Sequence, residues 1–156
     1  MPLPPGGTLN DYVPFYFTPF SPMMYNIYTG RGGVKSVANS DIVILVSDMH
    51  KIAELGLPYV FTDRHAYPVT CNYFNDLASL SAIDWPLLQN RNFQRDPDDP
   101  EKVERYQAEA LIYEHVPVQA LLGAICYRPE IQEELAAEAN RLGVPLEIHC
   151  MPGWYF

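Results

Sequence analysis

The sequence is short of basic residues, with 10 Lys and Arg against 19 Asp and Glu, and its formal net charge is −9. Nucleic-acid phosphates are bound mainly by Lys and Arg, so the overall charge taken alone argues against a nucleic-acid partner. The basic residues are unevenly placed, however, because eight of the ten lie between Arg31 and Arg105. Two interpretations remain open: a local basic face on an acidic protein, or scattered solvated charges.

The sequence also lacks long hydrophobic runs and a recognisable leader. No apolar run approaches the roughly 20 residues that a membrane-spanning helix requires. The first residues, MPLPPGGTLNDY, do not combine a basic region with a following apolar stretch, as a signal peptide would. The 3 cysteines are far apart, which fits reduced thiols better than a disulfide framework. These features predict a cytoplasmic protein with no membrane partner.

Several motifs of catalytic and metal-binding proteins are missing. There is no C-x-x-C, H-x-x-x-H or H-E-x-x-H, and the adjacent His149 and Cys150 would point to opposite faces of a strand. We therefore expect no metal site. No thiol and histidine are singled out as a hydrolase pair, and the glycine cluster at residues 30–33 is not a phosphate-binding loop. Paired carboxylates of a glycosidase are neither signalled nor excluded.

The composition of the chain favours a folded domain of mixed structure. Of its 156 residues, 48% are hydrophobic, and it contains 11 Tyr and 15 Pro, which favour strands, turns and fixed loops. The mixture of strands and helices has no regular βαβ rhythm and predicts one α+β domain. The patterns predict strands over residues 11–20, 41–48, 59–63, 110–118, 120–127 and 146–156, and helices over residues 49–56, 76–88 and 128–144. Residues 21–30 fit a helical turn or a strand, and residues 110–118 also fit helical spacing.

One carboxylate raises a question about chemistry. Glu109 opens a short apolar segment, RYQAEALIYEHVP, that follows a long polar loop over residues 89–104. Strand alternation would place Glu109 with Leu111 and Tyr113, opposite Ala110, Ile112 and Glu114. A carboxylate at this place could accept a hydrogen bond from a ribose hydroxyl and stabilise an oxocarbenium-like transition state. The residues alone equally allow an ordinary surface glutamate.

Four segments, taken in order, resemble a known family. The stretches GGTLNDYVPFYFTPFSPMMYNIYTG, YVFTDRHA, RYQAEALIYEHVP and the terminal WYF are similar to the DarT family of DNA ADP-ribosyltransferase toxins, across nearly the whole chain. The resemblance implies an ADP-ribosyltransferase fold, which is a split mixed β-sheet with flanking helices. It also implies transfer of ADP-ribose from NAD, a co-substrate, to thymine bases of single-stranded DNA, with release of nicotinamide. A macrodomain antitoxin of the DarG type, which removes the mark, would be a further partner.

The resemblance assigns roles to particular residues. Glu109 matches the catalytic glutamate of the family, which would hold the nicotinamide-side ribose and favour the loss of nicotinamide. His65, in TDRHA, lies in a segment that resembles the surround of the active site and is the second catalytic candidate, although it could simply cap a strand end. The loop over residues 89–104 matches the substrate-recognition loop. The DNA-binding residues implied for the loop and its end are Arg91, Phe93, Arg95, Lys102 and Arg105.

The resemblance also reveals one departure from the family. There, GGTLNDYVPF follows an N-terminal segment that supplies much of the NAD pocket and an arginine assigned to the thymine, whereas this chain starts at Met1. We therefore expect residues 1–156 to form one DarT-like domain, truncated at its N-terminus, whose NAD-binding residues stay unassigned. The alternative is an inactive module of the same fold that binds single-stranded DNA or a macrodomain antitoxin.

Overall fold

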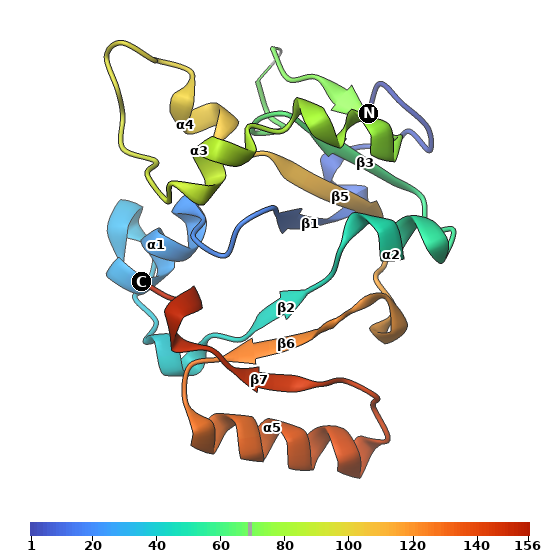
Figure 1. Ribbon diagram of the computed structural model, residues 1–156, viewed down its shortest axis with the longest axis vertical. Helices are drawn as coiled ribbons and strands as arrows, with labels where there is room; N and C mark the ends of the chain where they lie inside the picture. The colour runs from blue at the N-terminus through green and yellow to red at the C-terminus, as the bar shows by residue number, and fades with distance from the viewer. Residues whose placement is uncertain (69) are drawn as a thin grey trace.

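The computed structural model describes residues 1–68 and 70–156. Its strands form two separate sheets, of four and three strands, which lie one above the other in Figure 1. The strands are β1 Tyr12–Tyr16, β2 Ile44–Val46, β3 Tyr59–Thr62, β4 Tyr73–Phe74, β5 Glu109–Tyr113, β6 Gly123–Cys126 and β7 Ile148–Cys150. The strand order is β1-β5-β3-β4 in the first sheet and β2-β6-β7 in the second.

The helices are short except for the one near the C-terminus. The α-helices are α1 Pro22–Thr29, α2 Met49–Glu54, α3 Trp85–Gln89, α4 Lys102–Arg105 and α5 Pro129–Leu142. Single turns of 3-10 helix cover Leu9–Asp11, Arg31–Gly33, Asn39–Asp41, Val118–Ala120 and Pro152–Trp154, and a longer one covers Leu77–Ala82. Helix α1 begins where the Ser21 hydroxyl accepts the Met24 N–H, and it ends at Gly30, whose φ of 72° suits glycine.

The first sheet is wholly antiparallel and has β5 at its centre. β5 pairs with β1, where Tyr16 lies opposite Glu109, and with β3, where Phe61 lies opposite Ala110. The side chains of β5 alternate as the sequence predicted. Ala110 and Ile112 belong to the largest apolar cluster, while Leu111 packs in a second cluster on the other face.

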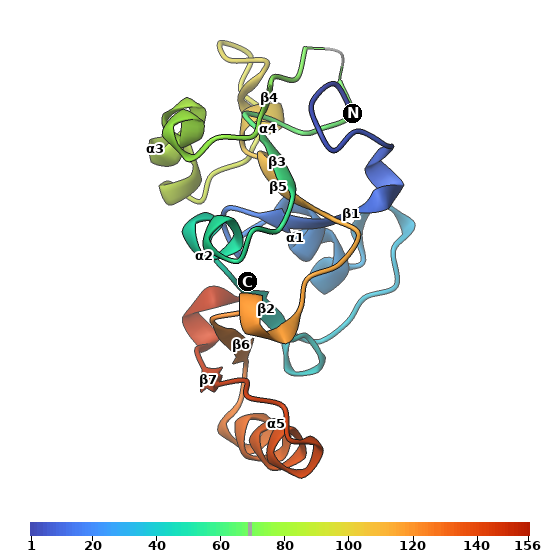
Figure 2. The same ribbon diagram turned by 90° about the vertical axis from the view of Figure 1, so that its right-hand side faces the viewer.

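The second sheet is mixed. β6 pairs antiparallel with β2 and parallel with β7, and α5 makes the connection between the two parallel strands. Helix α5 packs beside β7 at the end of the molecule away from the first sheet, as Figure 2 shows. The prediction of an α+β fold with a split mixed sheet is thereby confirmed.

Three predicted elements differ from the observed ones. The helix expected over residues 76–88 is broken in two, because Asp76 and Asp84 each cap a separate start by accepting the N–H of Ser79 and Leu87. The loop over residues 89–104 runs into α4, which the sequence did not predict. The strand expected over residues 41–48 is limited to the three residues that pair with β6.

Two predicted strand ends were also too long. The final strand stops at Cys150 because Pro152, which has no N–H to donate, starts a turn of 3-10 helix. β5 ends at Tyr113, since Glu114 has a left-handed backbone with φ of 60°. Glu114 therefore does not continue the strand face of Ala110 and Ile112, as the alternation had suggested.

Candidate active site

The backbone of Glu109 is fixed from both sides by the first sheet. On one side it faces Tyr16 of β1 in the strand register. On the other, the hydroxyl of the fully buried Thr62 accepts the Glu109 N–H at 3.1 Å and lies 3.3 Å from its carbonyl oxygen. A residue at the start of a central strand and tied to two neighbouring strands has a well-defined position.

The Glu109 side chain is buried, which excludes the ordinary surface glutamate. The residue is only 8% exposed. Burial raises the pKa of the Glu109 carboxyl above its ordinary value of 4.5, while the electrostatic effect of His65 and the backbone N–H of Ala66 act in the opposite direction. Burial, followed by the charge of Glu109, also raises the pKa of Tyr16. A buried carboxylate with a perturbed pKa is typical of functional sites.

His65 lies beside Glu109, just beyond the end of β3. Its Nε2 is 3.9 Å from the Glu109 Oε1, and its side chain is 39% exposed. Nδ1 accepts the Tyr67 N–H at 3.0 Å, so in the neutral ring the proton resides on Nε2, which faces the carboxylate. The His65 N–H also donates to the Glu104 carbonyl at 2.9 Å, which connects this corner to the loop over residues 89–104.

Arg105 holds the end of the same loop in place through hydrogen bonds. Its two terminal nitrogens donate to both oxygens of Asp99 at 2.9 and 2.7 Å, and its Nε donates to Asp84 at 3.2 Å. These hydrogen bonds, first of all those that Arg105 donates to Asp99, raise the pKa of Arg105. The guanidinium that the resemblance assigns to DNA thus already has three hydrogen bonds within the protein, and it joins the loop to the first turn of α3.

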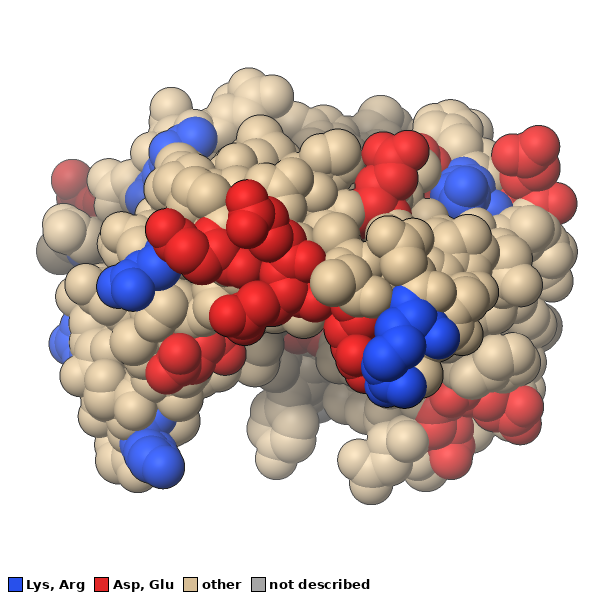
Figure 3. Space-filling model, turned by 90° about the horizontal axis from the view of Figure 1, so that it is seen from below, with Lys and Arg blue, Asp and Glu red and all other residues tan. Residues whose placement is uncertain are grey.

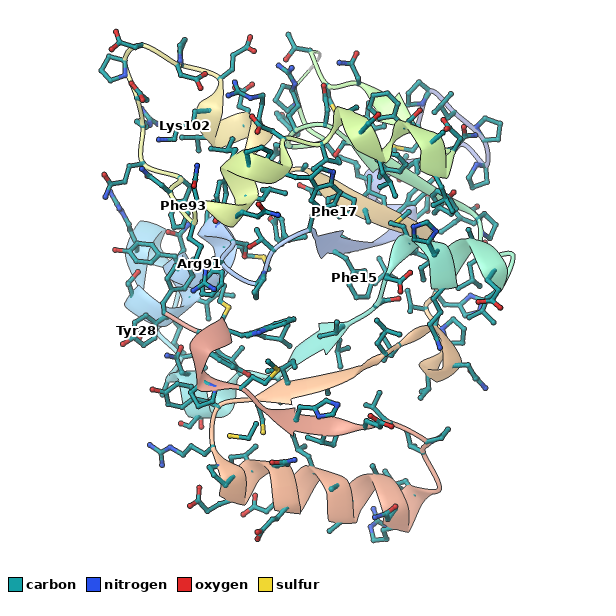
Figure 4. The ribbon with its side chains drawn as sticks, in the orientation of Figure 1. Phe15, Phe17, Tyr28, Arg91, Phe93 and Lys102 are labelled. Carbon is teal, nitrogen blue, oxygen red and sulfur yellow. The ribbon has the colours of Figure 1, made fainter. Side chains whose placement is uncertain are left out.

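Three of the five predicted DNA-binding residues gather around one hollow of about 740 Å³. Arg91, Phe93 and Arg95 line it together with α1, and Figure 4 shows Arg91 and Phe93 beside that helix. The guanidinium carbon of Arg91 lies 3.9 Å from the centre of the Phe20 ring. Lys102 is half-buried in α4 and is not among the described residues that line this hollow.

Sequence reasoning missed other residues of the same hollow. Tyr25 and Asn26 come from α1, Arg31 from the turn after it, and Phe156 from the end of the chain. The sequence presented Arg31 only as part of a glycine-rich loop, and Phe156 as the end of a strand. Among the described residues that line the hollow, neither Glu109 nor His65 is found.

A second hollow of about 610 Å³ separates the two sheets and has a mainly apolar lining. Phe15 of β1 and Phe17, just beyond the end of β1, border it, and Figure 4 shows both beside the space between the sheets. Ile44 and Val46 border it from β2. Phe15 and Phe17 also pack against the main apolar cluster, so this hollow opens directly onto the core of the first sheet.

Residues 1–68 and 70–156 contain neither a metal-binding cluster nor a membrane-spanning helix. No three His, Cys, Asp or Glu side chains in that part of the chain come together as a metal site would require. No helix within it has both the length and the apolar character needed to cross a membrane. The three cysteines, Cys71, Cys126 and Cys150, are all free thiols.

Comparisons with known proteins all point to the same family. A model of the family described as "ssDNA thymidine ADP-ribosyltransferase, DarT" matches residues 1–156. A DNA ADP-ribosyl transferase of Escherichia coli O127:H6 is 54% identical over 156 residues, which cover 100% of this chain and 72% of the relative. A DNA ADP-ribosyl transferase of Thermus sp. strain 2.9 is 40% identical over 135 residues, which cover 86% of this chain but only 63% of the relative.

Solved structures agree with the sequence relatives. DarT of Thermus sp. 2.9 in complex with NAD+ superposes with a TM-score of 0.91 at 33% identity, covering 100% of this chain and 78% of that one. The same protein in complex with ADP-ribosylated single-stranded DNA gives a TM-score of 0.91 at 33% identity, with coverage of 100% and 74%. The match of family and fold over the whole sequence shows that the chain belongs to the DarT family of single-stranded DNA thymidine ADP-ribosyltransferases.

Proposed function

We propose that this NAD-dependent DNA ADP-ribosyltransferase uses Glu109 as its catalytic carboxylate when it transfers ADP-ribose from NAD to a thymine base of single-stranded DNA. The supporting observation is the geometry of Glu109, which is 8% exposed at the first position of the central strand and lies beside His65. Membership of the DarT family supplies the reaction, and the burial and fixed position of Glu109 supply a reason for this residue to perform it.

The reaction replaces one glycosidic bond with another. The bond between the ribose C1′ and the nicotinamide nitrogen breaks, and nicotinamide leaves. C1′ then bonds to the one ring nitrogen of thymine that carries a proton in DNA, and that proton is released. Positive charge develops on the ribose in between, so a fixed carboxylate that accepts a ribose hydroxyl stabilises the transition state more than the ground state. The low exposure of Glu109 strengthens this interaction, since little water screens the carboxylate.

His65 has a positioning role in this proposal. The distance of 3.9 Å between Nε2 and Oε1 is too long for a hydrogen bond, so the imidazole acts on Glu109 through its charge distribution. Its other nitrogen is already engaged by the Tyr67 N–H. The ring therefore biases Glu109 toward the ionised form that the reaction requires.

The DNA strand is assigned to the loop over residues 89–104, which includes Lys102 of α4. Arg91, Arg95 and Lys102 have no ion pair within the described part of the chain, and they are proposed to bind DNA phosphates. Phe93 is proposed to stack on a base. Arg105, which the resemblance also assigned to DNA, would contribute chiefly by holding this loop through Asp99 and Asp84.

The family resemblance further supports a macrodomain antitoxin of the DarG type as a protein partner, and the cytoplasm as the place of action. A macrodomain antitoxin should remove the mark from DNA that this chain has modified. The check is to treat modified DNA with such a macrodomain and to measure the loss of the added mass. Modified DNA that the macrodomain leaves unchanged would contradict this assignment of the partner.

The proposed function is tested by intact mass spectrometry of oligonucleotides incubated with the chain and NAD. A single-stranded oligonucleotide with one thymine should gain one ADP-ribosyl unit, and a matched oligonucleotide without thymine should not. No mass gain on either, together with DNA binding that is independent of NAD, would contradict the proposal and favour the non-catalytic binding module.

A further inference from the structure

We propose that the hollow between α1 and residues 91–95, here called the arginine hollow, binds one nucleotide of the DNA strand next to the reacting thymine and selects its base. The inference rests on the proposed function and adds a site to it. The residues that carry it are Tyr25, Asn26, Arg31 and Phe156, none of which the sequence or the family resemblance had assigned to DNA.

The charge of the arginine hollow contrasts with that of the whole chain. The protein has 19 acidic and 10 basic residues, yet the lining of the hollow includes Arg31, Arg91 and Arg95 and no acidic side chain. In residues 1–68 and 70–156, none of these three arginines forms an ion pair. By contrast, Arg105 is tied to two carboxylates. Three unpaired guanidinium groups around one hollow are a site for a phosphate-bearing ligand.

The hollow also offers aromatic surface. The Phe93 ring packs edge-on against Tyr25 and Phe156, with centroid distances of 5.7 and 6.0 Å. All three rings line the hollow, whose volume of about 740 Å³ lies within the range of small-ligand pockets. Aromatic rings beside cationic groups are the usual platform for a nucleotide of a single strand, because every base has a stacking face.

The position of the hollow makes it a neighbour of the reaction site. Phe93 packs against Tyr106 at a centroid distance of 5.2 Å, and Tyr106 lies three residues before Glu109. Neither Glu109 nor His65 is among the described residues that line the hollow. A nucleotide bound here is therefore one that flanks the reacting thymine, and the loop over residues 89–104 connects the two positions.

Asn26 gives the hollow a means of reading a base. Its carboxamide has no hydrogen-bond partner among the described side-chain contacts, although its backbone carbonyl accepts the Gly30 N–H within the helix cap. A free carboxamide pairs with two atoms of an adenine edge, or with single atoms of the other bases. Asn26 is therefore the specificity-determining residue of this site, and Arg31 is its phosphate-binding residue.

The first test measures DNA binding of Arg31→Ala by fluorescence anisotropy at several salt concentrations. Loss of one phosphate contact should weaken binding and reduce the slope of log K against log salt by about 0.7. Lys35→Ala is the matched control, because Lys35 is exposed four residues farther on and does not line the hollow. Equal behaviour of the two variants would overturn the proposal. A loss of NAD affinity with DNA affinity intact would also overturn it, since the hollow would then serve NAD.

The second test measures sequence preference of Asn26→Ala with oligonucleotides that carry one thymine and randomised neighbours. Preference at one flanking position should fall by about 5- to 100-fold, while the other positions keep theirs. A preference unchanged at every position would contradict the role of Asn26. Failure of the wild-type chain to modify DNA would refute the proposed function, and the binding comparison of Arg31→Ala with Lys35→Ala would still decide whether the hollow binds the strand.

Discussion

The surroundings of Glu109 and the arginine hollow are built in opposite ways. Glu109 is buried at the start of a central strand, and hydrogen bonds to Thr62 on β3 fix its backbone. The arginine hollow is lined by loop and helix residues. Its three arginines are exposed, and they form no ion pair in the described part of the chain. A bond-breaking step needs a group in one position, whereas a strand that varies in sequence needs a surface that adapts. The comparison separates a site for chemistry from a site for substrate choice.

A second contrast explains how an acidic protein can bind DNA. Helix α5, PEIQEELAAEANRL, carries four glutamates and a single arginine, and Arg141 is paired with Glu138. Figure 3, which views the molecule from the α5 end, shows acidic side chains gathered on this face. The negative face repels a DNA strand, and the arginine hollow attracts it, so charge separation directs the strand to one side of the molecule.

The largest effect on the transfer rate is expected for a change at Glu109, and a nearby glutamate serves as the control. Glu109→Gln should lower the rate of ADP-ribose transfer by roughly 10²–10³-fold or more, because the amide cannot stabilise the charge on the ribose. Glu114→Gln changes an exposed glutamate just beyond the same strand and should leave the rate unchanged. Initial rates of nicotinamide release for the two variants check the prediction. Equal rates would show that Glu109 is not the catalytic carboxylate.

A change at Arg105 should weaken the connection between the two regions. Arg105→Ala removes the bidentate contact with Asp99 and the contact with Asp84, so the loop over residues 89–104 loses its fastening. We expect transfer to fall roughly 10- to 100-fold, since small displacements of a substrate are costly. Arg105→Lys, which cannot form the two-pronged contact, should be intermediate. The rate of ADP-ribose transfer is measured for both variants. A wild-type rate for Arg105→Ala would contradict the role of Arg105 in holding the loop.

The pH dependence of transfer should report the environment of Glu109. Burial raises the pKa of Glu109, so activity should fall as pH is lowered through a value above the ordinary 4.5. The electrostatic effect of His65 lowers that pKa, and His65→Gln should therefore move the acid limb of the profile to higher pH. Rate profiles of both proteins measure the shift. An acid limb that stays in place would mean that His65 does not act through Glu109.

Stability should respond to Glu109 in the direction opposite to activity. Because its pKa is raised in the folded protein, Glu109 favours folding below about pH 4.5 and loses that contribution as pH rises through the raised value. Glu109→Gln should consequently melt at a higher temperature than the wild type at neutral pH, with the difference disappearing at acid pH. Thermal unfolding at several pH values tests this. A variant that melts lower at neutral pH would contradict the cost of the buried charge.

The smallest effect is expected on α5. Glu133→Gln, on the acidic helix and away from both sites, should leave transfer and DNA affinity unchanged within about twofold, because an exposed charge at this distance is screened by salt. Anisotropy at moderate salt measures the affinity. A large change would show that DNA also follows the α5 face, and the contrast between the two faces would fail.

The sequence patterns predicted the strand that carries Glu109, but they did not predict the arginine hollow. The alternation in RYQAEALIYEHVP correctly separated Leu111 from Ile112, because each strand face packs against a different apolar cluster. The hollow escaped notice because Arg31 and Phe156 are distant in the sequence and meet only through the fold. The structural partner of Arg105 was equally hidden, since Asp84 lies 21 residues away, inside a segment that the pattern predicted as one continuous helix.

The central claim is that Glu109 performs the chemistry and the arginine hollow binds the strand. The most direct test measures the single-turnover rate of ADP-ribose transfer to a one-thymine oligonucleotide. The rates of Glu109→Gln and Arg31→Ala are compared with the wild-type rate at rising DNA concentrations. The account predicts that Glu109→Gln binds DNA like the wild type and transfers almost no ADP-ribose at saturation. It predicts that Arg31→Ala requires more DNA and then approaches the wild-type rate. Transfer by Glu109→Gln at the wild-type rate would contradict the central claim.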